Sequence, residues 1–495
     1  MHRREALKFA LAAATAPGWG SIVGGASAAT VRRSATEPPA ASLARHARCP
    51  VSTAEASAPG VRAYDALRLS WNGCWIARPA AIAHPRSEED VCRIVQWCRR
   101  ENYALRVRSG GHSFIGDSLC DGVVIDMSAL DAVAPGPMAA TARIGGGAML
   151  GPVAAELYHR LGRCTCTLGT CDSVGISGLL LGGGFGLMSR EHGLTIDALA
   201  SARVVLADGS VVETDASRNP DLFWAIRGGG GSFGIVTEMV LRTRSWRAVH
   251  GVTQHWTWTD APRVLRIWSA WIDTLPPGTS SSLVWATSGT TTSSDIRTIV
   301  RSDRSADEAE RCAASLSEAL GAEPTRAKSR TSGPPAAKPE LRLTGPRSAN
   351  ASAFARAEVD APTAARIAAA MEERRAGGRR FGDGTTMMIC NGLGGAVAKV
   401  PREATAFAHR DARFLAEFAA EWTTDTADAN AANGAWVRTV SDAVRPTLGG
   451  GSYLNYADAG LVDWRRAYWG ANLERLEAIK SRLDPTRSFG GRQSV

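Results

Sequence analysis

Two short glycine-rich stretches of this chain each contain one reactive side chain. Residues 106–113, Arg-Val-Arg-Ser-Gly-Gly-His-Ser, contain His112, and residues 169–178, Gly-Thr-Cys-Asp-Ser-Val-Gly-Ile-Ser-Gly, contain Cys171. Glycine lets the backbone approach a ligand closely and leaves N–H groups free to bind phosphates or the edge of a ring. We therefore predict that His112 and Cys171 contact the same bound molecule.

Three side chains further along are candidates for a general base, the group that removes the proton of a reacting hydroxyl. Tyr453 and Tyr456 lie in Gly-Ser-Tyr-Leu-Asn-Tyr, residues 451–456, and Glu417 lies in a predicted strand. A glutamate beside an apolar ring has a raised pKa and acts as a base near neutral pH. In a regular strand the two tyrosines point to opposite faces, so only one reaches the site. The alternatives are core packing for the tyrosines and an exposed carboxylate for Glu417.

Regular structure precedes the first glycine stretch. Ser87 is a typical helix N-cap residue, and acidic residues 88–90 occupy the favourable first turn. Apolar residues then recur on one helical face, and Leu105 and Val107 alternate with arginines as in a short strand. This order predicts a helix, a strand and then the turn that holds His112.

The remaining elements are predicted from turn signals and composition. Asp208-Gly209 separates two β-branched runs and predicts a hairpin, and residues 250–300, rich in Thr, Ser and Trp, predict antiparallel strands. Helices are predicted over residues 305–320 and 362–378, and from about Trp464 to Leu483, with a polar loop over 325–350. Hairpins mixed with helices, without an alternating βαβ series, predict the α+β class.

Composition limits the classes of function. The 495 residues are enough for two domains, and the net charge of +9 is spread without a basic block, which argues against nucleic-acid binding. No apolar run has the length of a membrane span. No C-x-x-C motif has a matching partner, so no metal site is expected, and the ten cysteines leave disulfide formation open.

The N-terminus has the pattern of an export signal. Arg3-Arg4 precede an apolar stretch over residues 9–23 and a small-residue site at Ala26-Ser27-Ala28, an arrangement that resembles a twin-arginine signal. We expect residues 1–28 to be a signal peptide and the protein to be exported. The alternative is a short hydrophobic helix in a cytoplasmic protein. Residues 29–60, rich in Ala, Ser, Thr and Pro, predict a linker or a poorly ordered arm.

The motifs together resemble the berberine-bridge-enzyme-like branch of the vanillyl-alcohol oxidase family. The resemblance rests on Arg-Val-Arg-Ser-Gly-Gly-His-Ser-Phe at residues 106–114, on G-x-C-x-x-V-G-x-x-G-x-x-x-G-G-G-x-G at residues 169–186, on residues 219–236 and on Y-x-N-Y at residues 453–456. It implies a PCMH-type FAD-binding domain and a substrate domain with a large antiparallel sheet covered by helices. It further implies FAD bonded through its 8α carbon to His112 and through C6 to Cys171.

The same resemblance implies further flavin contacts and domain boundaries. Residues expected at the flavin are Arg108, Ser109, Gly110, Gly111, Ser113, Val174, Gly175, Gly178, Gly182, Gly183, Ile235 and Asn455. Leu179 departs from the family, in which many relatives have histidine. A nicotinamide site is not expected, because no G-x-G-x-x-G lies between a strand and a helix with an acidic residue after it. The expected segments are an arm (29–75), an FAD-binding domain (76–247), a substrate domain (248–430) and a C-terminal segment returning to the FAD domain (431–495).

The implied activity is that of an FAD-dependent oxidase. It would remove a hydride from a hydroxyl carbon of a sugar, an alcohol or a glycosylated metabolite and reduce dioxygen to hydrogen peroxide; Val174 matches relatives that use dioxygen. One alternative is oxidative tailoring or cyclisation of a secondary metabolite with Glu417 as base. Another, from a different class, is a flavin-binding or resistance protein without turnover.

Overall fold

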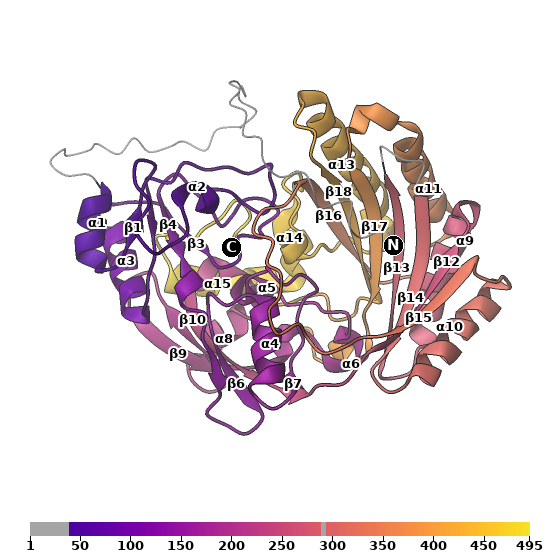
Figure 1. Cartoon of the computed structure of the whole chain (residues 1–495), viewed down its shortest axis with the longest axis horizontal. Coiled ribbons are helices and arrows are strands. Elements are labelled where there is room, and N and C mark those ends of the chain that lie inside the picture. The colour runs from indigo at the N-terminus through magenta and orange to yellow at the C-terminus, as the bar shows by residue number, and fades with distance from the viewer. Residues whose placement is uncertain (1–38, 289–293) are drawn as a thin grey trace. The chain divides into compact units, whose positions relative to one another are not determined.

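The computed structural model describes residues 39–288 and 294–495 (Figure 1). The predicted signal peptide and the beginning of the predicted arm lie outside these residues. The residues in these two ranges belong to one compact unit. None of the helices in the described ranges is long and apolar enough to cross a membrane. All ten cysteines lie in the described ranges, and none forms a disulfide.

The first sheet delivers the loop that holds His112. It has four strands in the order β1-β2-β4-β3, with β1 (Val51–Ser52), β2 (Ala81–Ala83), β3 (Leu105–Arg108) and β4 (Val123–Asp126). Helix α3 (Glu88–Arg100) connects β2 to β3, and both of these strands run parallel to β4. Ser87 and Asp90 form a capping box at the start of α3, which confirms the predicted helix start.

The second sheet is antiparallel, with the order β5-β6-β10-β8-β9. Its strands are β5 (Val133–Pro135), β6 (Thr141–Gly145), β8 (Leu199–Val205), β9 (Val211–Asp215) and β10 (Ile235–Arg242). Strands β8 and β9 form the predicted hairpin, and Gly209 in its turn has φ of 80°. This sheet packs with α4 (Leu150–His159), α5 (Ile176–Leu181), α8 (Pro220–Ala225) and α15 (Leu473–Leu483) in one hydrophobic core.

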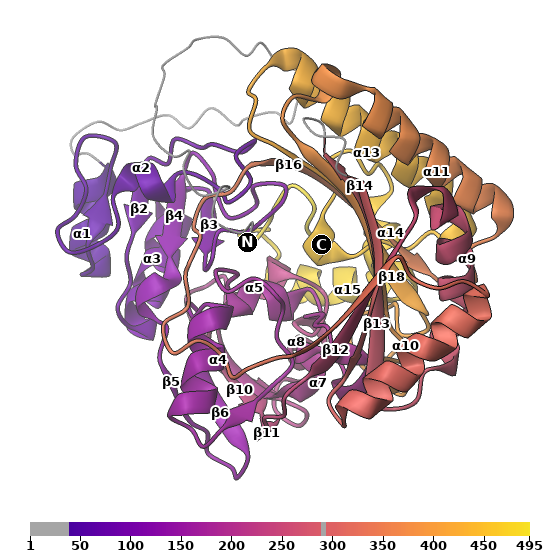
Figure 2. The same ribbon diagram turned by 45° about the vertical axis from the view of Figure 1, so that its right-hand side comes forward.

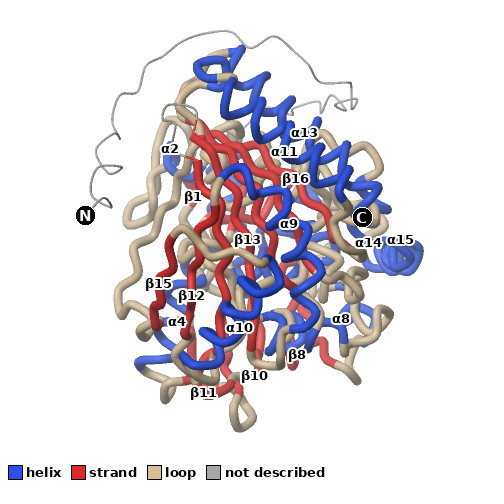
Figure 3. The backbone as a smooth tube through the Cα atoms, turned by 90° about the vertical axis from the view of Figure 1, so that its right-hand side faces the viewer, coloured by secondary structure: helices blue, strands red, loops and turns tan. Residues whose placement is uncertain are grey.

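The third sheet has seven antiparallel strands in the order β15-β12-β14-β13-β17-β18-β16. The strands are β12 (His250–Trp256), β13 (Thr279–Ser288), β14 (Ser294–Ser302), β15 (Arg326–Thr331), β16 (Arg347–Ala355), β17 (Thr385–Gly392) and β18 (Phe414–Trp422). Helices α9 (Ala261–Trp271), α10 (Ala306–Leu320), α11 (Ala361–Ala376) and α13 (Ala427–Leu448) cover one face, as Figures 2 and 3 show. The α+β class and the large helix-covered antiparallel sheet are thus confirmed.

Short helices and strands complete the chain. They are α1 (Pro39–Ala47), α2 (Tyr64–Leu67), β7 (Cys164–Thr165), α6 (Ser189–His192), α7 (Thr195–Ala198), β11 (Arg244–Ser245), α12 (Gly395–Ala398) and α14 (Trp464–Trp469).

Several local predictions are wrong. Residues 39–47 form helix α1 rather than a linker, because Leu43 and Ala47 are buried with α3 in one core. Helix α9 interrupts the predicted strands, and β15 with the start of β16 occupies part of the predicted loop. The C-terminal helix is broken at Gly470, whose φ is 48°. The predicted boundary at residue 431 falls inside α13, which packs on the third sheet; residues from Tyr453 onward join the core of the second sheet.

Asn72 connects the loop that holds His112 to the third sheet. Its Nδ2 donates to the carbonyl oxygens of Phe114 and Ser348, both at 2.8 Å. Its Oδ1 accepts from the backbone N–H groups of Ser348, at 2.9 Å, and Cys74, at 3.1 Å. The side chain is buried, so these four bonds satisfy its donors and its acceptor oxygen away from bulk water.

We expect Asn72→Ala to destabilise the fold by about 2–3 kcal/mol, because it leaves buried backbone groups of Phe114 and Ser348 without partners. Chemical denaturation monitored by tryptophan fluorescence measures this change. Asn430→Ala is a suitable control, since Asn430 bonds Asp425 and Trp422 at the periphery. If Asn72→Ala lowered the free energy of unfolding no more than Asn430→Ala, Asn72 would not have this connecting role.

Candidate active site

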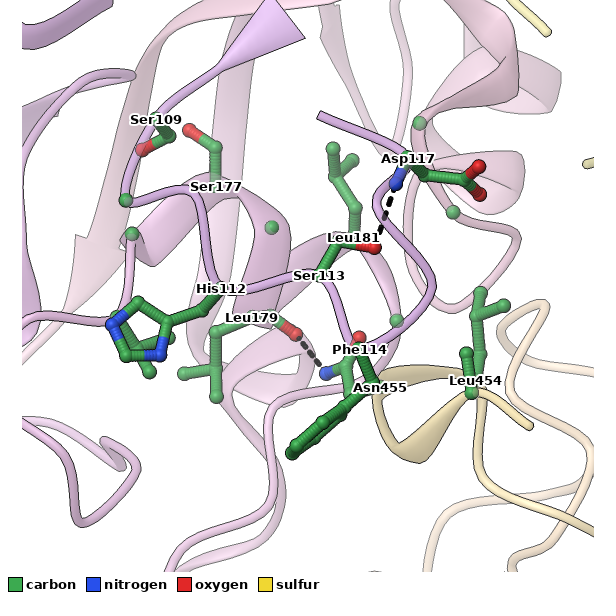
Figure 4. Close-up of a pocket in the computed structure, with 18 of the residues that line it drawn as sticks. Ser109, His112, Ser113, Phe114, Asp117, Ser177, Leu179, Leu181, Leu454 and Asn455 are labelled. Atoms are coloured by element: carbon green, nitrogen blue, oxygen red, sulfur yellow. Dashed lines mark hydrogen bonds between the residues drawn. The ribbon is translucent and has the colours of Figure 1, made fainter. Parts of the chain in front are cut away.

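A cavity of about 640 Å³ lies between the glycine-rich loops and the third sheet. One side is lined by the backbone of three segments, 109–113, 169–182 and 229–236. The other side is lined by residues of neighbouring strands, including Ser282 of β13, Asn391 of β17 and Glu417 of β18. Figure 4 shows His112, Ser113, Leu179 and Asn455 around the cavity, with Asn455 donating to the carbonyl oxygen of Leu179 at 2.8 Å.

The two glycine-rich stretches touch each other directly. A Cβ on Gly110 would clash with the backbone nitrogen of Gly175, and a Cβ on Gly175 would clash with Ser109 Oγ. Only glycine at these two positions permits this approach. The contact brings His112 and Cys171 to one wall of the cavity, as their spacing in two separate loops predicts.

Ser173 links the two reactive side chains. His112 Nε2 lies 2.9 Å from Ser173 Oγ, and Cys171 Sγ lies 3.5 Å from the same oxygen. Ser173 itself is buried. The Ser173 hydroxyl therefore contacts both the imidazole and the thiol, and the imidazole has a second hydrogen bond, to the backbone of Arg342.

His112 is held as a neutral imidazole. Its ring stacks on Trp71 with centroids 5.1 Å apart and the planes inclined by 22°. Burial, helped by the nearby charge of Arg108, lowers the pKa of His112 to about 4. At neutral pH one of the two ring nitrogens therefore carries a lone pair, which the formation of a bond to carbon requires.

The cavity fits FAD on grounds of shape. Gly178 and Gly231 both line it, and a Cβ on either would meet no atom within 4 Å and so would project into open space. Because neither residue has a side chain, the backbone at both positions is open to the cavity. A flat ring can lie against such backbone, and a pyrophosphate can accept hydrogen bonds from its N–H groups. Val174, Gly182 and Ile235 also line the cavity.

Two of the residues expected at the flavin lie outside the cavity lining. Arg108 is buried beneath Gly111 and donates from Nη1 to the carbonyl oxygen of Leu69 at 2.9 Å. Gly183 has φ of 128° and lies against the ring of Phe407, where a Cβ would be 2.9 Å from a ring carbon. Both residues therefore support the loops from the side away from the cavity. The other expected flavin contacts line the cavity.

The structure separates the roles of the two tyrosines. Residues 454–456 form a 3-10 turn rather than a strand, so the rings of Tyr453 and Tyr456 lie together, with centroids 5.1 Å apart. Tyr453 Oη accepts from the N–H groups of Gly184 and Phe185, both at 3.1 Å. Asn455 Nδ2 also lies 2.9 Å from it. In the described chain we find no protein hydrogen bond to Tyr456 Oη, so Tyr456 is the tyrosine available to a ligand.

Glu417 is buried on the cavity face of β18, where it pairs with Ile389 of β17. Burial, together with the nearby Glu421, raises the pKa of Glu417 to about 8, against an opposing hydrogen bond from Asn350. Burial also raises the pKa of Tyr456, and the charge of Glu417 contributes to that shift, which places the two groups within electrostatic reach.

Sequence reasoning missed several residues of the site. Ser173 stands inside the recognised motif, at a position that the motif leaves variable. Trp71 and Arg301 line the cavity from segments with no local signal, and only the fold brings them there.

Family models match two segments of the chain. A model described as an FAD binding domain covers residues 79–215, and one described as berberine and berberine like covers residues 452–495. The first segment contains both glycine-rich stretches, and the second contains Tyr453 and Tyr456. The protein is therefore an FAD-binding oxidoreductase.

Similarity over nearly the whole chain defines the family. The chain is 30% identical to glucooligosaccharide oxidase of Sarocladium strictum, covering 84% of this chain and 87% of that protein. It is 29% identical to aclacinomycin-N/aclacinomycin-A oxidase of Streptomyces galilaeus, covering 88% of each. A solved structure of glucooligosaccharide oxidase from Acremonium strictum, described as containing 6-S-cysteinyl, 8α-N1-histidyl FAD, superposes with a TM-score of 0.80 at 27% identity and covers 93% of this chain and 99% of that one. The chain belongs to the berberine-bridge-enzyme-like family of FAD-linked oxidoreductases.

We expect Tyr456→Phe to retain the fold and bound flavin but to slow flavin reduction by substrate roughly a hundredfold or more, because the proton-accepting oxygen is lost. Tyr453→Phe should instead lower stability by about 1–3 kcal/mol, since the N–H groups of Gly184 and Phe185 lose their acceptor. Anaerobic stopped-flow absorbance and thermal unfolding measure the two effects.

The pH dependence of the same reduction provides the control. The rate in the wild type should rise with pH up to about 8, as the Glu417 carboxyl loses its proton, and Glu417→Gln should be slower and should remove this rise. If flavin reduction were nearly normal in Tyr456→Phe and severely slowed in Glu417→Gln, the Glu417 carboxylate alone would be the base.

Proposed function

We propose that this enzyme oxidises a hydroxyl-bearing carbon of a sugar and transfers the electrons to dioxygen, forming hydrogen peroxide. The observation that carries the proposal is that one cavity holds the paired His112 and Cys171 loops on one wall and Tyr456 with Glu417 on another. The similarity to named oligosaccharide oxidases over most of the chain supports sugar as the class of substrate.

We further propose that FAD is bonded to both His112 and Cys171. The support is geometric: both side chains approach one hydroxyl, that of Ser173, from loops in backbone contact. His112 also has a hydrogen bond to the backbone of Arg342, which together with Ser173 fixes the orientation of the ring. Two attachment points fix a flavin without walls on every side, which leaves room for a bulky substrate.

The side chains divide the chemistry of the reaction. Bound FAD supplies a hydride acceptor. Tyr456 Oη takes the proton of the substrate hydroxyl and passes its own proton to Glu417, because burial makes a free tyrosinate costly while the carboxyl titrates near neutral pH. Tyr453 stays neutral and positions the turn through its backbone bonds.

A second candidate function is oxidative tailoring of a glycosylated secondary metabolite. It is favoured by the similarity to aclacinomycin oxidase, and by a cavity that opens between two sheets. A flavin-binding protein without turnover is disfavoured, because Tyr456 Oη has no protein partner among the described residues and Glu417 has a pKa suited to proton transfer. We also propose export through the twin-arginine signal of residues 1–28, on the sequence pattern alone.

A substrate screen separates these functions. We expect anaerobic addition of an oligosaccharide to bleach the flavin absorbance, and admission of air to restore it with one hydrogen peroxide per turnover. Bleaching by glycosylated metabolites but by no free sugar would select the tailoring function. Flavin that no hydroxyl compound reduces would contradict the oxidase proposal.

We expect flavin to remain with the wild-type protein after acid precipitation, as an absorbing pellet and a mass increase of one FAD. His112→Ala and Cys171→Ala should each retain one bond, and the double variant should release all flavin. Ser173→Ala should lower the covalently loaded fraction, because both nucleophiles lose their orienting hydroxyl. Complete release of flavin from the wild type would exclude both bonds.

A further inference from the structure

Arg301 of β14 lies in the cavity without an acidic partner. It is half-buried among the cavity-lining residues, and in the described parts of the chain its guanidinium has one hydrogen-bond acceptor, Ser282 Oγ, 2.9 Å from Nη1. Ser282 in turn donates to Asn391 Oδ1 at 2.8 Å. An arginine has five N–H donors, so most of those of Arg301 are left for a ligand.

The absence of a carboxylate beside Arg301 is energetically unusual. Burial lowers the pKa of Arg301 to about 10, and no nearby acidic group opposes that shift. The side chain is still charged at neutral pH. A desolvated cation costs free energy unless an anion pairs with it, and a guanidinium pairs best with a carboxylate, through two parallel N–H···O bonds.

Basic residues continue on the same face to the edge of the sheet, where one acidic residue, Asp295, pairs with Arg297 and His255. In the strand register, Arg301 of β14 stands opposite Gly251 of β12, and Gly251 stands opposite Arg330 of the edge strand β15. Residues opposite each other in antiparallel strands share a face, and alternate residues do too, so Lys328 and Arg326 of β15 lie on this face as well. All residues of β15 are exposed. Gly251 leaves the space between the two arginines without a side chain.

Arg301 lies far from the reacting end of the cavity. Three strand spacings separate β14 from β18, and Arg301 is four residues along the register from the level of Glu417. These steps correspond to roughly 20 Å between the two Cα atoms. The guanidinium of Arg301 reaches back to Ser282 of β13, which stands two strand spacings and two residues from Glu417 in the register, or roughly 12 Å away. A group bound by Arg301 is therefore on a different sugar unit from the one that reacts at Tyr456 and Glu417.

We propose that the substrate is an acidic oligosaccharide, and that Arg301 binds the carboxylate of a uronate unit adjacent to the unit that is oxidised. In longer chains Arg330 and Lys328 bind further carboxylates along the β15 edge. This inference rests on the proposed function, since it names the class of sugar that the same cavity accepts. The net charge of +9 favours encounter with such a polyanion.

The direct test compares a neutral disaccharide, cellobiose, with its uronate counterpart, cellobiouronic acid, in which the unit beyond the reducing glucose carries a carboxylate. We expect the wild type to have a KM at least tenfold lower for the acid. Arg301→Gln should raise that KM tenfold or more and leave the KM for cellobiose within about threefold. Arg311→Gln removes one charge from the helix-covered side of the same sheet, on α10, and should change neither value.

Oligosaccharides of different length test the basic residues of the edge strand β15. The double variant Lys328→Gln, Arg330→Gln should weaken binding of an acidic hexasaccharide several-fold and leave the acidic disaccharide unaffected. Raising the ionic strength should reduce the preference for the acid in the wild type and not in Arg301→Gln.

Binding measured without turnover keeps this inference separate from the proposed function. Cellobiouronic acid is titrated by calorimetry into enzyme already reduced with dithionite, which cannot oxidise it. Binding that depends on Arg301 supports the acidic subsite even if no sugar is oxidised, in which case only the oxidase proposal fails. Equal affinity for both sugars, or an equal loss with both in Arg301→Gln, would overturn the subsite and assign Arg301 to the flavin or to sugar hydroxyls.

Discussion

The backbone contact between Gly110 and Gly175 is the constraint on which the rest of the site depends. The first loop leaves a strand of the four-stranded sheet, and the second leads into α5, which packs with the five-stranded sheet. A side chain at either glycine would push the loops apart, because the space is filled by backbone and by Ser109. His112, Ser173 and Cys171 meet only while that contact holds. Two separately packed sheets are thereby joined at the cavity that His112 and Cys171 line.

The seven-stranded sheet supplies the opposite wall through the two-residue period of its strands. Alternate residues of β13, β14, β17 and β18 enter the helix-covered core, and the residues between them face the cavity. A polar residue on the cavity face is shielded from bulk water, so it must bond to its neighbours or to a ligand. The polar residues Ser282 and Asn391 of this wall are thus bonded to each other, whereas Arg301 is charged and has donors left for a ligand.

Burial acts differently on the two kinds of titratable group in the cavity. It keeps His112 and Tyr456 neutral and raises the pKa of Glu417 to about 8. Arg301 keeps its charge, because even a lowered arginine pKa stays well above neutral pH. The carboxyl of Glu417 and the guanidinium of Arg301 therefore stand on different strands of one sheet, β18 and β14.

The sequence by itself determined the cofactor-binding loops and most local elements, because those signals act between near neighbours. The capping box at Ser87, the Asp208-Gly209 turn and the glycine spacing around His112 and Cys171 each report a short-range steric requirement. The tertiary structure decided which tyrosine hydroxyl is occupied by the protein, since that of Tyr453 accepts from N–H groups about 270 residues away in sequence. It also turned residues 39–47 into a helix by burying Leu43, and it brought Trp71 and Arg301 to the cavity. These outcomes depend on long-range packing and on the strand register, for which a local pattern contains no information.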